Sequence, residues 1–314
     1  MKILVTGCAG FIGSHFSLYL MEKYPEDSIV GVDAMTYAAN EEALESLLAY
    51  RQFRFYKENI CNEGAIQHIF AEEHPDIVVN FAAETHVDRS ISDASPFLQT
   101  NVIGTQILLE ASAQNNVRRF HQVSTDEVYG DVPLHINYHF NEESALRPSS
   151  PYSASKASAD LLAQSYMRTF GLPVSISRCT NNYGIYQHPE KLIPKTISRI
   201  CEGKAVELYG NGNNVRDWLY VGDHCRAIDL IIRKGKCEVY NVGADNLRSN
   251  IDLVRKIMTL SGKPDGEIRF VQDRKGHDRK YLINCRKLTS LGWQPEADFE
   301  RELQNTVEWY KSKK

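Results

Sequence analysis

The chain opens with Lys2-Ile-Leu-Val-Thr6-Gly7-Cys-Ala-Gly10-Phe-Ile-Gly13, an apolar run followed by three glycines at intervals of three residues. This order predicts a β-strand that turns sharply into a phosphate-binding loop and then into a helix from about Ser14 to Tyr24. The first glycine permits the tight turn, the second lets a pyrophosphate approach the backbone, and the third lets the helix pack on the sheet. Such a helix directs its first backbone N–H groups at the bound anion.

A second apolar run, Ser28-Ile-Val-Gly-Val-Asp33, ends in an acid twenty residues after Gly13. An Asp at the tip of the second strand accepts hydrogen bonds from a ribose 2'-hydroxyl and repels a 2'-phosphate. We therefore predict that the cofactor is NAD rather than NADP. The alternative, a glycine turn near an unrelated surface Asp, is weaker because strand, turn, helix, strand and acid occur in order.

Apolar strand-like runs alternate with amphipathic helical stretches over the first part of the chain, which predicts an α/β fold with a Rossmann-type doubly wound parallel sheet. After about Tyr183 the alternation gives way to loops rich in Gly, Asn and Pro. We expect residues 1–183 to bind NAD and carry the catalytic residues. Residues 184–314 should form a smaller C-terminal substrate-binding lobe, with the chain crossing between the two. The predicted later strands are Phe53–Tyr56, Ile77–Phe81, Arg119–Ser124 and Val174–Ser177, and the predicted later helices are Glu42–Tyr50, Glu63–Glu73, Pro96–Gln114 and Tyr152–Phe170.

Composition narrows the class of protein. The 314 residues are 42% hydrophobic and carry a net charge of -4, whereas a general nucleic-acid binder would carry a basic face. The seven cysteines are odd in number and never form a C-x-x-C pair, as expected for free thiols in a reducing cytoplasm. We expect neither a signal peptide nor a membrane-spanning helix, because no apolar run is long enough.

The first candidate catalytic cluster is Tyr152-Ser-Ala-Ser-Lys156, which places a phenol and an ammonium at i and i+4 on one helix face. An ammonium beside a phenol stabilises the phenolate. Lowering the tyrosine pKa from about 10 toward 7 requires roughly 4 kcal/mol. Tyr152 would then accept a hydroxyl proton near neutral pH. A chance pair on a surface helix is the alternative, but together with the NAD-binding unit the pair indicates a short-chain dehydrogenase.

The second cluster, Ser124-Thr-Asp-Glu127, follows a predicted strand at its carboxyl end. Adjacent carboxylates repel each other, yet in an elimination they have separate tasks. One removes a carbon-bound proton while the other protonates the departing hydroxyl. A solvated acidic turn is the alternative reading of the same residues.

With these clusters the chain resembles the extended short-chain dehydrogenases/reductases, and within them it is similar to the dTDP-glucose 4,6-dehydratases. The Thr-Asp-Glu triplet separates this group from the related sugar epimerases. The resemblance covers nearly the whole chain and rests on these stretches: the Gly7 loop, Ala82–Ser90, Thr100–Thr105, Ser124–Gly130, Ser150–Ala157, Cys179–Gly184, Pro189–Pro194, Arg216–Val221 and Gly276–Arg279.

The resemblance implies a reaction in three stages. Tyr152, helped by Lys156 and positioned with Thr125, removes the C4 hydroxyl proton of a hexose while NAD takes the C4 hydride. Glu127 then takes the acidified C5 proton as Asp126 protonates the C6 hydroxyl. Return of the hydride to C6 and of a proton to C5 gives a 4-keto-6-deoxy sugar nucleotide, so NAD is regenerated and should copurify.

The resemblance also implies binding residues, with three departures from the family pattern. Cys8 replaces Gly, Asn59 replaces Asp and Lys275 replaces Pro. The implied cofactor residues are Gly7, Gly10, Phe11, Ile12, Gly13, Asp33, Asn59, Ile60, Ala82, Ala83, Thr100, Tyr152, Lys156 and Asn182. The implied substrate residues are Thr85, Thr125, Asn181, Lys191, Leu192, Arg216, Asn250, Arg274 and His277.

We expect no metal site, since His86, Asp88, Asp223 and His224 lack metal-ligand spacing and suit capping or packing roles. The resemblance further implies a homodimer in which the helices Pro96–Gln114 and Tyr152–Phe170 form a four-helix bundle. The apolar residues assigned to it are Ile103, Ile107, Leu108, Leu161, Leu162 and Tyr166.

Two other functions stay open at this point. One is a dehydratase or epimerase acting on another sugar nucleotide, such as UDP-GlcNAc or UDP-glucose. The other is a non-catalytic NAD-binding regulator, which would have no reason to keep both clusters.

Overall fold

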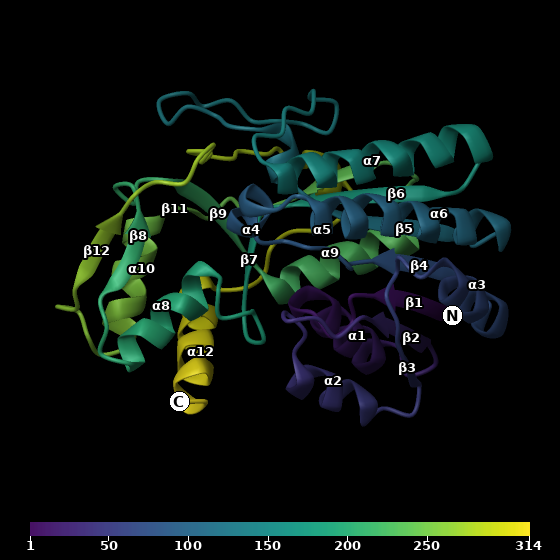
Figure 1. Ribbon diagram of the computed structural model, residues 1–314, viewed down its shortest axis with the longest axis horizontal. Coiled ribbons are helices and arrows are strands. Elements are labelled where there is room, and N and C mark those ends of the chain that lie inside the picture. The colour runs from purple at the N-terminus through teal and green to yellow at the C-terminus, as the bar shows by residue number, and fades with distance from the viewer.

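A seven-stranded parallel sheet forms the centre of the protein in the computed structural model, which describes residues 1–314 (Figure 1). The strand order is β10-β6-β5-β4-β1-β2-β3, so the direction of winding reverses between β1 and β4. The strands are β1 (Lys2–Thr6), β2 (Ser28–Asp33), β3 (Phe53–Lys57), β4 (Ile77–Asn80), β5 (Arg119–Thr125), β6 (Val174–Cys179) and β10 (Val239–Val242). The predicted Rossmann-type sheet is confirmed.

Helices cover both faces of this sheet because successive side chains on each buried strand point to opposite faces. Leu4 packs with α3 (Glu63–Glu73), α6 (Thr105–Gln114) and α7 (Pro151–Phe170). Its neighbours Ile3 and Val5 pack with the helices of the other face. Those helices are α1 (Phe11–Lys23), α2 (Glu41–Leu48) and α9 (Val221–Lys234).

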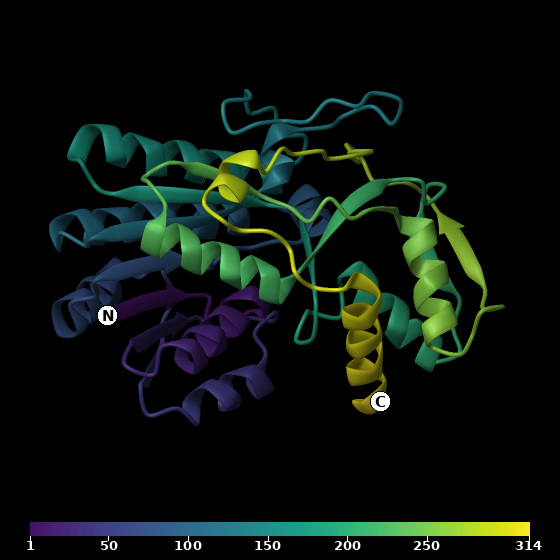
Figure 2. The ribbon, with the colours of Figure 1, turned by 180° about the vertical axis from the view of Figure 1, so that it is seen from behind.

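The C-terminal part of the chain builds a second, smaller body and also returns to the main sheet. The smaller body contains a three-stranded sheet in the order β11-β9-β7, a two-stranded sheet of β12 and β8, and its own apolar core. Strand β10 completes the edge of the large sheet, and α9 lies beside α1 (Figure 2). The division after residue 183 stays a prediction. The remaining elements are α4 (Val87–Ser92), η2 (Asp126–Tyr129), β7 (Asn181–Tyr183), α8 (Leu192–Cys201), β8 (Val206–Tyr209), β9 (Val215–Tyr220), β11 (Leu247–Ser249), α10 (Asn250–Leu260), β12 (Ile268–Val271), α11 (Arg286–Ser290) and α12 (Phe299–Ser312).

The prediction of a single helix over Pro96–Gln114 is wrong in detail. This stretch of the chain forms α5 (Ser95–Phe97), a π-helical segment η1 (Leu98–Gly104) and α6. The wide turn lets Asn101 face inward, where its amide exchanges two hydrogen bonds with the backbone of Glu84, at 2.9 and 3.0 Å. Apolar periodicity does not distinguish such a segment from an ordinary helix.

The glycine-rich turn behaves as predicted. Gly7 has a φ of +67°, and a Cβ on it would lie 2.7 Å from the backbone nitrogen of Ala82. A Cβ on Gly13 would lie 2.2 Å from the Gly7 carbonyl oxygen, so only glycine lets α1 approach the loop so closely. No helix of the protein combines the length and apolarity needed to cross a membrane.

Candidate active site

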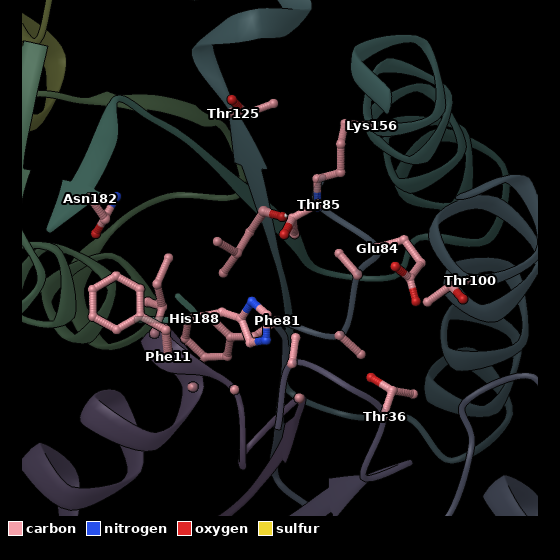
Figure 3. A pocket seen from close by; sticks show the side chains of 18 of the residues that line it. Phe11, Thr36, Phe81, Glu84, Thr85, Thr100, Thr125, Lys156, Asn182 and His188 are labelled. Atoms are coloured by element: carbon pink, nitrogen blue, oxygen red, sulfur yellow. Dashed lines mark hydrogen bonds between the residues drawn. The ribbon is translucent and has the colours of Figure 1, made fainter. Parts of the chain in front are cut away.

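Two adjoining cavities lie at the carboxyl ends of the central strands, where ligands bind in open α/β sheets. The first has a volume of about 310 Å³, and every residue predicted for the cofactor or for catalysis lines it. Figure 3 shows Phe11 and Asn182 on one side of this cavity and Thr36 and Thr100 on the other. Five residues line both cavities: Thr85, Glu127, Asn181, Glu190 and Lys191.

One end of the first cavity is built to hold a pyrophosphate and an unphosphorylated ribose. The amides of Phe11, Ile12 and Gly13 precede the first α1 hydrogen bond, which Ser14 donates to the Gly10 carbonyl at 3.0 Å. They are therefore available to an anion. The Asp33 carboxylate accepts from the amides of Ala9 at 2.9 Å and Met35 at 2.8 Å, which fixes it beside the loop.

These observations make the cavity fit NAD. Asp33 keeps free lone pairs for ribose hydroxyls, while its acidic oxygens disfavour an added phosphate. Asn59 also lines the cavity, and its side-chain oxygen accepts from the Cys61 amide at 2.9 Å. The NH₂ group of Asn59 therefore remains free to donate a hydrogen bond to a ligand.

At the other end of the cavity, α7 presents Tyr152 and Lys156. The helix begins with a capping box in which the Ser150 hydroxyl accepts from the Ser153 amide and the Ser153 hydroxyl accepts from the Ser150 amide. This cap places the tyrosine in the first helical turn, against the end of β5.

The predicted effect of Lys156 on Tyr152 is not seen in this structure. The Lys156 ammonium donates to the Val123 carbonyl at 2.6 Å, not to the phenol. Burial, and then the charge of Glu127, raise the pKa of Tyr152 well above 10, while the Thr125 hydroxyl partly offsets them. Because the Lys156 ammonium is held by a backbone carbonyl, it does not offset the effect of burial on the pKa of Tyr152 in this arrangement.

Asp126 and Glu127 stand at the start of η2, directly after β5, and both line the first cavity. Tyr129 anchors this short segment, because its hydroxyl donates to Asn241 at 2.7 Å and accepts from Arg178 at 2.9 Å. Asp126 is therefore fixed in a buried position and Glu127 is partly covered, unlike the acids of a solvated turn.

The two acids differ in their environment. Burial, reinforced by Glu127, raises the pKa of Asp126 well above its ordinary value, and one of its carboxyl oxygens has no partner in the protein. Burial also raises the pKa of Glu127, but the Arg216 guanidinium opposes that rise. The environment therefore favours the protonated form more strongly at Asp126 than at Glu127, which lies near a fixed cation.

The second cavity, of about 580 Å³, contains every remaining residue predicted for the substrate. Arg216 is held by carbonyls, donating to Val215 at 2.8 Å and to Asp278 at 2.9 Å, and its guanidinium lies over the ring of Tyr281. A cation fixed in this way suits a diphosphate. The side-chain oxygen of Asn250 is buried without a partner. The other predicted residues in this cavity are Leu192, Arg274 and His277.

Several lining residues were missed by the sequence reasoning. Cys179 ends β6 and Thr180 follows it, so strand position alone could have indicated them. Asp88 receives two hydrogen bonds from Arg274, at 2.6 and 2.9 Å, and sequence gives no signal of that pairing. Tyr281 likewise carries no local signal.

The histidines considered for a metal have other partners. His86 accepts from the Arg89 amide at the start of α4, and His224 bonds to the Asn182 side chain at 2.9 Å. No group of three His, Cys, Asp or Glu side chains is arranged to hold a metal ion.

A family model described as GDP-mannose 4,6 dehydratase matches residues 4–306. The chain belongs to this family. It is 46% identical to "dTDP-glucose 4,6-dehydratase 1" of Escherichia coli K12, over 99% of this chain and 93% of that protein. It is 47% identical to the low-salt glycan biosynthesis protein Agl12 of Haloferax volcanii, over 99% and 98%. Among solved structures, DesIV, a dTDP-glucose 4,6-dehydratase from Streptomyces venezuelae with NAD bound, superposes with a TM-score of 0.95 at 43% identity, over 99% and 97%.

The part of the chain that matches the family model includes nearly all of the central sheet and the residues that line both cavities. The match spans the first cavity, with its glycine loop, and the second cavity, with its fixed arginine. The resemblance inferred from the sequence is confirmed at the level of the family.

Proposed function

We propose that the protein is an NAD-dependent dTDP-glucose 4,6-dehydratase that releases water and forms dTDP-4-keto-6-deoxyglucose. The proposal rests on the adjacent acids Asp126 and Glu127, which line the first cavity in different environments: Asp126 is buried with a carboxyl oxygen that has no partner, whereas Arg216 opposes the rise in the pKa of Glu127. An elimination needs this division, whereas an epimerase has no leaving group to protonate. The relatives named above support dTDP-glucose as the substrate.

The residues of this chain then act in sequence. Tyr152 removes the C4 hydroxyl proton, with Thr125 and Lys156 around it. NAD, held by the glycine loop and Asp33, would supply the acceptor for the C4 hydride and the donor of the hydride that C6 receives. Glu127 takes the C5 proton, which the C4 ketone has made acidic, while Asp126 gives its proton to the C6 oxygen and water leaves. A proton returns to C5 as C6 receives the hydride, which completes the 4-keto-6-deoxy product.

The nucleotide part of the substrate is assigned to the second cavity. We expect Arg216 and Asn250 to hold the diphosphate, and Lys191 and Leu192 to contact the nucleoside. Arg274 and His277 close that end. The sugar lies where the two cavities meet, against Thr85 and Asn181 together with the acid pair.

We further propose a homodimer in the cytoplasm, built on the outer faces of α5–η1–α6 and of α7. Ile103 is 44% exposed and Leu161 is 59% exposed on these faces. Ile107, Leu108 and Tyr166 were wrongly assigned to the bundle, because all three are buried in the core of a single chain.

The test is to incubate the purified protein separately with dTDP-glucose, UDP-glucose, UDP-GlcNAc and GDP-mannose. Mass spectrometry should show a product 18 Da lighter (about one water) from dTDP-glucose. A product of unchanged mass would indicate an epimerase. Dehydration of another nucleotide alone would correct the substrate and leave the reaction in place.

A further inference from the structure

Four side chains from three segments meet beside the cofactor cavity. We call them the clasp: Tyr37 from the loop 34–40, Arg89 from α4, and His188 and Glu190 from the segment that follows β7. The Arg89 guanidinium carbon lies 3.6 Å from the centre of the Tyr37 ring. The Tyr37 hydroxyl donates to Glu190 at 3.4 Å, and Arg89 lies 3.5 Å from the same carboxylate.

A ring contact completes the clasp. The Tyr37 and His188 rings meet edge to face, with centres 5.3 Å apart. The Glu190 carboxylate accepts from Tyr37 and lies 3.7 Å from the His188 ring nitrogen. Tyr37 therefore contacts both α4, through Arg89, and the segment after β7, through His188. The Glu190 carboxylate lies within reach of Tyr37 and Arg89 together.

Two of the segments that the clasp joins, the loop 34–40 and the segment after β7, both line the cofactor cavity. Thr36, Ala38 and Ala39 line it from the loop 34–40, and Gln187, His188 and Glu190 line it from the other segment. Figure 3 shows Thr36 and His188 within this cavity. Tyr37 and Arg89 line neither cavity, so their contacts join the two walls and do not touch a ligand.

The loop 34–40 depends on such a contact at its apex. Its start is fixed by the Met35 amide, which donates to Asp33, and its end by the Asn40 amide, which donates to the Ala9 carbonyl at 2.8 Å. Both anchors belong to the phosphate-binding side of the cavity. Tyr37, between these anchors, is the side chain that contacts the segment after β7.

We propose that Tyr37 and Arg89 are positioning residues that retain the cofactor by holding the two walls of its cavity together. The reason for retention rests on the proposed function, since the hydride removed from C4 must return to the same sugar. If the reduced cofactor left midway, a dehydrated keto intermediate would be stranded. The contacts are half-exposed and long, so the clasp opens without unfolding the core.

The test measures release of NADH from loaded protein in the absence of any sugar nucleotide. NADH fluorescence is followed after mixing with excess NAD. We expect Tyr37→Ala and Arg89→Ala each to release NADH about tenfold faster, which corresponds to about 1.4 kcal/mol. Tyr37→Phe keeps the ring contacts and loses only the bond to Glu190, so it should show a smaller increase.

A control variant, a double variant and a measurement of unfolding complete the test. Tyr50→Ala removes a tyrosine that lines neither cavity, and it should leave the release rate unchanged. The Tyr37→Ala/Arg89→Ala double variant should release NADH no faster than either single variant, because both remove one shared contact. Unaltered thermal unfolding of the NAD-free variants checks that the fold is intact.

Release rates equal to wild type in both alanine variants would overturn the proposal. So would fully additive effects in the double variant, since these would mean that Tyr37 and Arg89 act separately. Because no sugar nucleotide is present, failure here is distinct from failure of the dehydratase assignment. In turnover, the alanine variants should lose activity progressively and recover it when NAD is added.

Discussion

Changing Glu127 to Gln should separate the first stage of the reaction from the second. The amide keeps the size of the side chain but cannot accept the C5 proton. A positioned base contributes about 10²- to 10⁴-fold, or about 2.7–5.4 kcal/mol. We expect a loss in the upper half of this range, because burial raises the pKa of the neighbouring Asp126 and so disfavours the carboxylate that a substitute base would need.

The same substitution should not slow oxidation at C4. The charge of Glu127 is the second cause, after burial, that raises the pKa of Tyr152. Removing this charge lowers the pKa of the phenol and so favours the base that oxidation requires. The variant should therefore accumulate reduced cofactor together with a 4-keto-glucose nucleotide.

The assay is a single turnover in deuterated water, followed by absorbance of the reduced nicotinamide and by mass spectrometry of the sugar. Deuterium should enter C5 in Asp126→Asn, which keeps the base, and not in Glu127→Gln. Glu143→Gln, at an exposed acid outside both cavities, should behave as wild type. Equal exchange in the Asp126 and Glu127 variants would refute the assignment of the two roles.

Three further outcomes are expected. Turnover should follow a bell-shaped pH profile. On the acid side it should fall as Glu127 is protonated, at a pH above the ordinary glutamate pKa of 4.5, and on the alkaline side it should fall as Asp126 loses its proton. Glu127→Gln should remove the acid limb from the residual activity. Gly13→Ala should cost about 1–3 kcal/mol of stability in thermal unfolding and reduce the copurified NAD, because its Cβ would lie 2.2 Å from a carbonyl oxygen. Leu161→Glu and Ile103→Glu should give a particle of one chain in sedimentation, and a mass of two chains would place the interface elsewhere.

The sequence was sufficient for features that depend on neighbouring residues. The turn at Gly7, the acid at the tip of β2 and a helix that carries both Tyr152 and Lys156 follow from local chemistry, and each occurs as predicted. The orientation of Lys156 toward the Val123 carbonyl was not predictable, because i, i+4 spacing fixes a helix face but not the partner that a long side chain selects.

Contacts between distant segments were also beyond the sequence. Asp88 and Arg274 are 186 residues apart, and only the folded chain brings them together. The burial of Ile107 within one chain was missed for a related reason. An apolar stripe on a helix shows that a face is covered, but it does not show whether the same chain or a second copy covers it.

The return of the chain to the central sheet limits how this protein can be divided. Side chains of α9, including Val221 and Ile228, belong to the same core as Ile3 and Val5 of the first strand. A fragment that stopped after β7 would leave α1 uncovered and β6 as an open, unpaired edge. The substrate-binding lobe therefore cannot be exchanged as a separate unit. A chimaera with a different lobe would have to keep β10 and α9 of this chain, because both belong to the central sheet and its covering layer.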